Sequence, residues 1–153
     1  MLALLLFSFA IVFVDQFVKV LVCAFLKPDG SLTVIDGLLY ITYLENKGAA
    51  FGIFENARLF FIILTSAVIV ALLFILKKTK IRSRLFLFAV ALIIGGGIGN
   101  LIDRIFLGYV VDYIYVTFFP PICNFADYSV SLGVALLIVY LLFFHEKSGY
   151  APK

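Results

Sequence analysis

The sequence predicts an all-α membrane protein, a four-transmembrane-helix bundle with a small extracytoplasmic β-cradle or hairpin. Composition is the first reason: 65% of the 153 residues are hydrophobic and 14% are charged, whereas soluble domains have roughly 45–50% apolar and about 25% charged residues. The mean hydropathy of +1.20 agrees with this. Four long apolar runs are the second reason. We therefore expect a single membrane domain over residues 1–153.

The four apolar runs are each about long enough to cross a hydrocarbon core of ~30 Å as a helix. The first run lacks a basic N-terminal region and a small-residue cleavage site, and it is too long for the apolar part of a signal peptide. We therefore interpret it as a membrane span, with a cleaved signal peptide as the alternative. The spans are expected at about 2–26, 59–76, 85–102 and 128–144.

The segment 77–84, KKTKIRSR, holds five of the twelve basic residues and no acid. Basic residues in short loops favour the cytoplasmic side of a membrane. Segment 77–84 and both termini are therefore predicted to be cytoplasmic, and the outer segments 27–58 and 103–127 to lie outside. The net charge of +3 is small and concentrated in this loop, which indicates membrane orientation and not nucleic-acid binding.

The outer segments contain β-prone stretches. Residues 32–44 form two such runs around Asp36-Gly37, a pair favoured in tight hairpins. Residues 108–119 also favour extended structure, and we expect Pro120-Pro121 to end it. A small sheet resting on the outer membrane surface follows from these patterns.

The stretch ENKGAAFGIFEN precedes the second span. Asn46 and Gly48 indicate a tight turn there. Residues 49–54 are semi-apolar, and composition leaves open whether they form a loop or an amphipathic segment in the membrane interface.

Two charged residues lie inside the first span. Asp15 and Lys19 are four residues apart and so share one helical face. If residue 2 is near the cytoplasmic surface, the rise of 1.5 Å per residue places Asp15 about 20 Å deep, toward the outer leaflet. A charge there costs several kcal/mol unless it is paired, so both side chains should face the bundle interior. A structural ion pair is the simpler role, and direct catalysis is the alternative.

The third span ends in GGGIGNLIDR. Small residues such as Gly99 and its neighbours let helices approach closely in lipid. Asn100, Asp103 and Arg104 then form a polar cluster at the outer helix end. Arg104 is the nearest basic residue before Asp112, and we expect it to balance or orient a neighbouring carboxylate.

Asp112 and Asp127 are the only charged residues between Val110 and Ser129. The two prolines exclude one continuous helix, so the segment can double back, and closing a loop of about fifteen residues costs a few kcal/mol of chain entropy. Two carboxylates in one site share a proton near neutral pH. One can then activate water while the other protonates the carbonyl oxygen and the leaving amine, as peptide hydrolysis requires. Asp127 could instead only cap the fourth span.

Other hydrolytic chemistries fit less well. HExxH and GxSxG motifs are absent from the sequence, and the third span contains GIGN where presenilin-type proteases have Gly-x-Gly-Asp. One His and two distant cysteines, Cys23 and Cys123, do not form an ordinary zinc site, so no metal is expected. A Ser–Lys dyad would need Lys19 beside Ser129 or Ser131, and nothing specific indicates this pairing.

Five motifs carry a resemblance to a known family. DQFVK, ENKGAAF, GNLIDR, GYVVDY and NFAD occur in the order found in bacterial lipoprotein signal peptidase (signal peptidase II). The resemblance covers the chain from Asp15 to Asp127 and the last span. It implies an intramembrane aspartyl endopeptidase, without a cofactor, that cleaves prolipoprotein signal peptides just before a diacylglyceryl-modified cysteine. It also implies a bacterial cytoplasmic (inner) membrane location, with the active site near the outer leaflet.

The family's functional positions map onto this chain residue by residue. The catalytic dyad maps onto Asp112 and Asp127. The family's β-cradle and the segment over its active site map onto the predicted hairpin and the stretch after Asn46. Cys123 replaces a usual aromatic and Tyr113 a commoner Phe, which could alter pocket packing. The residues implied to shape the pocket and hold the dyad are Asp15, Lys19, Asn46, Gly48, Gly99, Asn100, Asp103, Arg104, Asn124 and Ala126.

The expected partners are lipid-modified prolipoproteins and membrane lipids, with no nucleic acid, and the chain is expected to act as a monomer. Diacylglyceryl chains can be recognised through burial, at ~0.8 kcal/mol per buried CH₂. Two other classes remain as alternatives. A transporter would use Asp15, Lys19, Asp103 and Arg104 as a polar path, and a non-catalytic assembly factor would tolerate Asp112→Asn.

Overall fold

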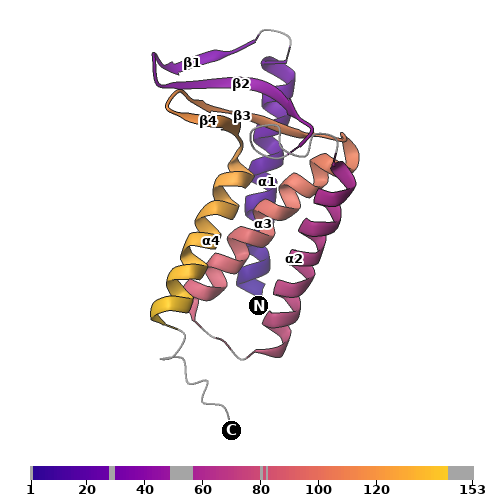
Figure 1. Ribbon diagram of the computed structural model, residues 1–153, viewed down its shortest axis with the longest axis vertical. Coiled ribbons are helices and arrows are strands. Elements are labelled where there is room, and N and C mark those ends of the chain that lie inside the picture. Colours follow the sequence, from indigo (N-terminus) through magenta and orange to yellow (C-terminus); the bar gives the residue numbers. More distant parts are fainter. Residues whose placement is uncertain (1, 28–29, 49–56, 80, 82, 145–153) are drawn as a thin grey trace.

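The computed structural model describes residues 2–27, 30–48, 57–79, 81 and 83–144. Within these residues, four helices form a bundle and a four-stranded antiparallel sheet covers one end of it (Figure 1). Each helix is long and apolar enough to cross a membrane, which confirms the predicted fold class. The elements are α1 (Leu2–Phe25), β1 (Leu32–Ile35), β2 (Leu39–Asn46), α2 (Arg58–Lys78), α3 (Arg84–Phe106), β3 (Val110–Val116), β4 (Phe119–Cys123) and α4 (Phe125–Phe143).

Helix α3 is the centre of the bundle. Buried residues make up 61% of its most apolar window, against 6% for α2. It packs against α4, α1 and α2, while the outward faces of those three helices expose large apolar side chains. Such a surface is stable in lipid and not in water. Both α3 and α4 extend beyond the apolar runs at the sheet end, because polar residues there bond to other elements instead of breaking the helices.

Glycines on α3 allow the central helix contacts. A Cβ at Gly95 would lie 2.9 Å from the carbonyl oxygen of Ser8 on α1, and one at Gly96 would lie 2.5 Å from that of Ala126 on α4. Both contacts are with backbone, so neither partner can turn aside. The close approach expected for small residues is therefore present at both interfaces.

The sheet has the strand order β1-β2-β3-β4. The predicted hairpin is confirmed, with its turn at residues 36–38 and Gly37 at a φ of 70°. The register pairs Leu44 with Asp112 and Asn46 with Val110. This pairing brings the end of β2 beside the start of β3, close to Asp112.

The expectation that Pro120-Pro121 end the extended segment is wrong. Both prolines lie in β4, and the chain reverses before them, at residues 117–118. β4 is an edge strand with an irregular register against β3, and prolines are tolerated at sheet edges and bulges. The reversal pairs Cys123 with Ile114, so the chain enters α4 from a point beside β3.

One face of the sheet packs on α1. Val22 of α1 is buried against Val111 and Tyr113 of β3. At the rim, Lys27 forms a 3.0 Å ion pair with Glu45 of β2. The end of α2 and the start of α3, which flank the basic segment, lie at the opposite end of the bundle from the sheet (Figure 1). The predicted segment 49–54 lies outside the described residues.

Candidate active site

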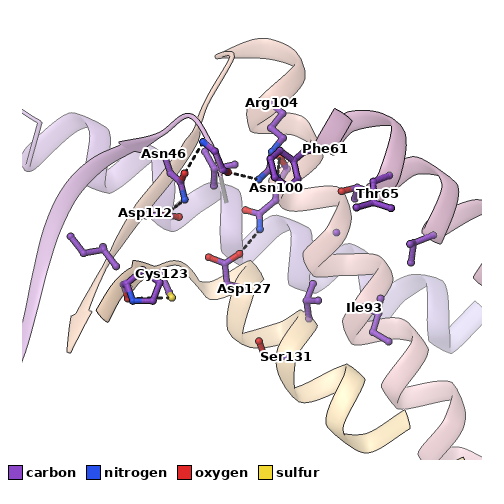
Figure 2. A pocket seen from close by; sticks show the side chains of 18 of the residues that line it. Asn46, Phe61, Thr65, Ile93, Asn100, Arg104, Asp112, Cys123, Asp127 and Ser131 are labelled. Atoms are coloured by element: carbon purple, nitrogen blue, oxygen red, sulfur yellow. Dashed lines mark hydrogen bonds between the residues drawn. The ribbon is translucent and has the colours of Figure 1, made fainter. Parts of the chain in front are cut away.

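The two aspartates from the sequence lie on one cavity. Asp112 belongs to β3 and Asp127 to the first turn of α4, and both line a space of about 670 Å³. Figure 2 shows their carboxylates facing the same space, next to the side chains of Asn46 and Asn100. The doubling back of the chain at 117–118 brings them together, since β4 returns alongside β3 before α4 begins.

Three asparagines donate hydrogen bonds to these carboxylates. Asn46 donates to Oδ2 of Asp112 over 2.7 Å and Asn124 to its Oδ1 over 2.6 Å. Asn100 donates to Oδ1 of Asp127 over 2.7 Å. The donors come from β2, the α4 N-cap and α3, so three elements converge on the pair.

Each asparagine is held in this orientation by a donor to its carbonyl oxygen. Asn46 accepts from the backbone N–H of Gly48 at 2.9 Å, and Asn124 accepts from that of Asp127 at 2.9 Å. Asn100 accepts from Nζ of Lys19 at 2.9 Å. Turning any of these amides would place donor against donor, so their NH₂ groups stay directed at the carboxylates.

The N-terminus of α4 is capped entirely by side chains and its own first turn. Asn124 and Asp127 form a reciprocal capping box, with Asp127 Oδ2 accepting from the Asn124 N–H at 3.1 Å. The N–H of Phe125 donates to the Tyr113 hydroxyl at 3.2 Å, and that of Ala126 donates to Oδ1 of Asp15 at 3.0 Å. Asp127 therefore does cap the helix, as the alternative held, and still presents Oδ1 to Asn100.

Behind the carboxylates lies a buried charged cluster. Nζ of Lys19 is 2.9 Å from Oδ2 of Asp15 and 2.9 Å from Oδ2 of Asp103, so the ion pair expected within α1 is present and has a third member. Asp103 also accepts from the N–H of Val111 at 3.1 Å, which ties α3 to β3. Gly99 leaves room for this cluster, because a Cβ there would lie 2.5 Å from Asp15 Oδ2.

Gln16 is a further member of the cluster that the sequence analysis did not select. Its Nε2 donates to Asp103 Oδ1 at 3.0 Å and to the carbonyl oxygen of Gly99 at 3.1 Å. Its position beside Asp15 in an apolar span was the available signal. Burying a neutral amide in lipid costs less free energy than burying a charge, so Gln16 is a weaker sequence signal than Asp15 or Lys19.

Arg104 lies at the cavity wall. Its guanidinium donates to the carbonyl oxygens of Asn100 at 3.4 Å and Gly48 at 3.5 Å and lies 5.0 Å from the ring centre of Phe61. No carboxylate of the described residues lies within ion-pairing distance of it. Its charge instead acts through space on both Asp112 and Asp127.

The protonation of Asp112 is poised near neutrality. Burial and the negative charge of Asp127 raise its pKa to about 7, and the donors Asn46 and Asn124 oppose part of that rise. A carboxyl group with this pKa can hold or release a proton at ordinary pH, as acid–base catalysis requires.

The two departures from the family pattern have different surroundings. Cys123 lines the cavity, and burial raises the pKa of its thiol to about 11, so the thiol stays protonated. Tyr113 is buried and faces away from the cavity. Its hydroxyl accepts a hydrogen bond from the Phe125 N–H. A phenylalanine would leave that helix donor without this acceptor.

Lys19 and the serines of α4 form no Ser–Lys hydrogen bond among the described residues. Ser129 donates to the carbonyl oxygen of Phe125 at 2.9 Å, while Lys19 is occupied by Asp15, Asp103 and Asn100. In the part of the chain that the structure describes, no three His, Cys, Asp or Glu side chains are grouped closely enough to hold a metal ion.

Comparison with known proteins identifies the family of the chain. The profile of a family described as signal peptidase (SPase) II matches residues 7–143. The chain belongs to the signal peptidase II family. Membership implies a protease in a membrane, and the curated relatives are bacterial.

Individual relatives cover nearly the whole chain. It is 46% identical over 134 residues to the lipoprotein signal peptidase of Caldanaerobacter subterraneus subsp. tengcongensis, covering 88% of this chain and 91% of that protein. It is 46% identical over 139 residues to that of Halothermothrix orenii, covering 91% and 94%. A bacterial membrane enzyme solved by the in meso method at 2.3 Å superposes with a TM-score of 0.87 at 34% identity, covering 100% of this chain and 94% of that one.

Proposed function

We propose that this signal peptidase II is an aspartic endopeptidase. It removes the signal peptide of diacylglyceryl-modified prolipoproteins by cutting immediately before the lipidated cysteine. The observation that carries the proposal is the pair Asp112 and Asp127 on one cavity, with the pKa of Asp112 raised to about 7. The relatives named lipoprotein signal peptidase support the substrate class.

The geometry divides the work between the two carboxyl groups. Asp127 stands in the first turn of α4 and accepts from the Asn124 N–H and the Asn100 amide, all of which stabilise negative charge. Asp127 is therefore the base and Asp112 carries the proton. Asp127 takes a proton from the attacking water while Asp112 protonates the carbonyl oxygen. The C–N bond then breaks as the amine leaves with a proton from the dyad.

The cavity suits a lipid-anchored substrate. It extends from the dyad along apolar side chains of α2 and α4, including Leu64, Val68 and Val130. Hydrocarbon chains gain free energy by lying against such walls. The positive-inside tendency places the sheet end, and with it the dyad, at the outer leaflet, where a lipid anchors the cleavage site. The proposal includes a bacterial cytoplasmic-membrane location, cytoplasmic termini, a monomeric enzyme and no cofactor.

The decisive experiment compares aspartate variants on a synthetic diacylglyceryl-modified prolipoprotein peptide. Asp112→Asn and Asp127→Asn should each lower kcat/KM by at least about a hundredfold, because each removes an acid–base group. Asp36→Asn is the matched control, since Asp36 is an exposed aspartate of the same sheet, away from the cavity. Thermal unfolding in detergent checks that the variants fold. Parent-like cleavage by both dyad variants would contradict the proposal, as would equal cleavage of the unlipidated precursor.

A further inference from the structure

Two hydroxyl groups project into the apolar part of the cavity. Thr65 lies on α2 and Ser131 on α4, and both line the space that contains the dyad (Figure 2). Neither hydroxyl has a hydrogen-bond partner among the described residues. By contrast, the hydroxyls of Ser8, Thr79 and Ser129 donate to backbone carbonyl oxygens. The free hydroxyls of the cavity are therefore available to a bound ligand.

Both residues lie deeper in the bundle than the carboxylates of the dyad, Thr65 because it faces Gly97, three residues below the Asn100 that binds Asp127. Ser131 follows Asp127 by four residues on α4, about 5–6 Å along the axis. Thr65 follows Phe61 by four residues on α2, and the Phe61 ring contacts Arg104 at the cavity wall. A ligand cut at the dyad would thus pass these two groups on its way into the bundle.

The surroundings define the chemistry of that ligand. The side chains near the two hydroxyls are apolar, among them Val68, Ile69 and Val130. Thr65 is half-buried and Ser131 is exposed, so a hydrocarbon ligand that covers them leaves each hydroxyl without a partner unless the ligand carries an acceptor. The matching ligand therefore has acceptor oxygens a few bonds from the cleaved peptide and hydrocarbon beyond them. A diacylglyceryl thioether has this order: cysteine, glycerol carbons, two ester carbonyls, then acyl chains.

We propose that Thr65 and Ser131 donate hydrogen bonds to the ester carbonyls of the diacylglyceryl group and so select an ester-linked lipid. The inference rests on the proposed function and adds a polar element to recognition by burial. Apolar walls alone would accept any hydrocarbon chain of suitable length. Two hydroxyl donors distinguish a diester from a lipid of the same length without carbonyls, since the wrong lipid leaves both donors unpaired.

The test uses two lipopeptides of identical peptide sequence and chain length, one with ester-linked chains and one with ether-linked chains. The parent enzyme should prefer the diester by about tenfold in kcat/KM, because the diether has no carbonyl oxygens for the two hydroxyl donors. The double variant Thr65→Val, Ser131→Ala should bring the ratio close to one. The loss should appear mainly in KM of the diester, because the bonds are made in the bound substrate and kept in the transition state.

Ser66→Ala is the matched control, since Ser66 follows Thr65 on α2 but does not line the cavity. It should keep the ester preference of the parent. A purely structural effect of the double variant would slow both substrates equally and keep the ratio, which would overturn the inference. Equal cleavage of diester and diether by the parent would also overturn it. Failure of the proposed function would give a different result: the parent would cleave neither lipopeptide, or Asp112→Asn would cleave both. The inference would then fail together with the proposed function.

Discussion

At the residue scale, the dyad is surrounded by neutral donors. Asn46 and Asn124 bind Asp112, and Asn100 binds Asp127, while the lysine of the site is kept behind Asn100. An amide stabilises a carboxylate less than a cation does, so Asp112 is held in place without being forced to ionise. The proposed proton exchange near neutral pH depends on this balance.

The pH profile of cleavage should report Asp112. The donor role requires its protonated form, so kcat/KM should fall as the pH rises through about 7. Asn46→Leu removes a donor that lowers the pKa of Asp112, so the fall should move to higher pH. Leu44→Ala is the control, because Leu44 pairs with Asp112 through backbone only and is exposed. An unshifted profile in Asn46→Leu would show that Asp112 is not the titrating group.

The chemical role of single residues was easier to predict from the sequence than the hydrogen bonds between them. Asp112 and Asp127 were selected because unpaired carboxylates in an apolar chain are costly, and the structure places both on one cavity. Asn124 contacts both aspartates, because its amide donates to Asp112 and it forms the capping box with Asp127. These contacts depend on the return of β4 alongside β3, which no local sequence pattern predicts. Gln16 was missed because its role depends on Asp103, which lies far away in sequence.

At the element scale, the spacing between α3 and α4 depends on Gly96. A Cβ there would lie 2.5 Å from the carbonyl oxygen of Ala126 and 2.9 Å from Cγ2 of Val130. Ala126 adjoins Asp127, so any displacement of α4 would move the dyad. The neighbouring Gly97 faces α2 instead, where a Cβ would lie 3.5 Å from Ile69 and Thr65, an ordinary contact distance.

Gly96→Ala should therefore lower the thermal unfolding temperature in detergent, with a loss of about 1–3 kcal/mol, as for overpacked cores. Gly97→Ala adds the same methyl group to the same helix without a clash, and alanine is the better helix former by roughly 1 kcal/mol. It should be neutral or stabilising. Equal effects of the two substitutions would mean that helix propensity, and not the α3–α4 contact, decides stability here.

The element predictions succeeded where the signal was local. The apolar runs predicted the helices, and Asp36-Gly37 predicted the β1–β2 turn. Pro120-Pro121 misled because a proline is excluded only from interior strands, and the edge position of β4 is a property of the whole sheet. The turn at 117–118 carries none of the usual turn residues, and contacts between elements stabilise it: Thr117 donates to the carbonyl oxygens of Leu38 and Gly37.

At the scale of the whole molecule, the buried polar and charged side chains lie in one layer between the bundle and the sheet. α1 contributes Asp15 and Lys19, α3 contributes Asn100 and Asp103, and α4 begins in this layer. Away from it the helices are almost wholly apolar. A bilayer that covers the apolar faces would therefore have its boundary at the dyad, with the sheet in the interface.

One corner of the sheet should penetrate the lipid. Its two hairpin turns are joined by the Thr117–Leu38 hydrogen bond and form one tip. Phe118 and Phe119 at this tip are 76% and 54% exposed, and β4 leads directly into α4. Exposed phenylalanines gain free energy by entering the boundary between headgroups and acyl chains. β1 lies three strand spacings away, roughly 14 Å from β4, and should remain in water.

The chain has no tryptophan, so a single introduced indole reports its own depth. In vesicles, Phe118→Trp should emit at short wavelength and be quenched by lipids brominated in the upper acyl chain. Leu32→Trp, at a site of β1 that is equally apolar and 57% exposed, should emit at longer wavelength and be quenched by aqueous acrylamide. Exposure and hydrophobicity alone would give both sites the same behaviour, so a difference between them measures the tilt of the sheet on the bilayer. Quenching of both indoles by acrylamide would show that the sheet does not touch the lipid. The dyad would then lie farther from the bilayer than its apolar surroundings indicate.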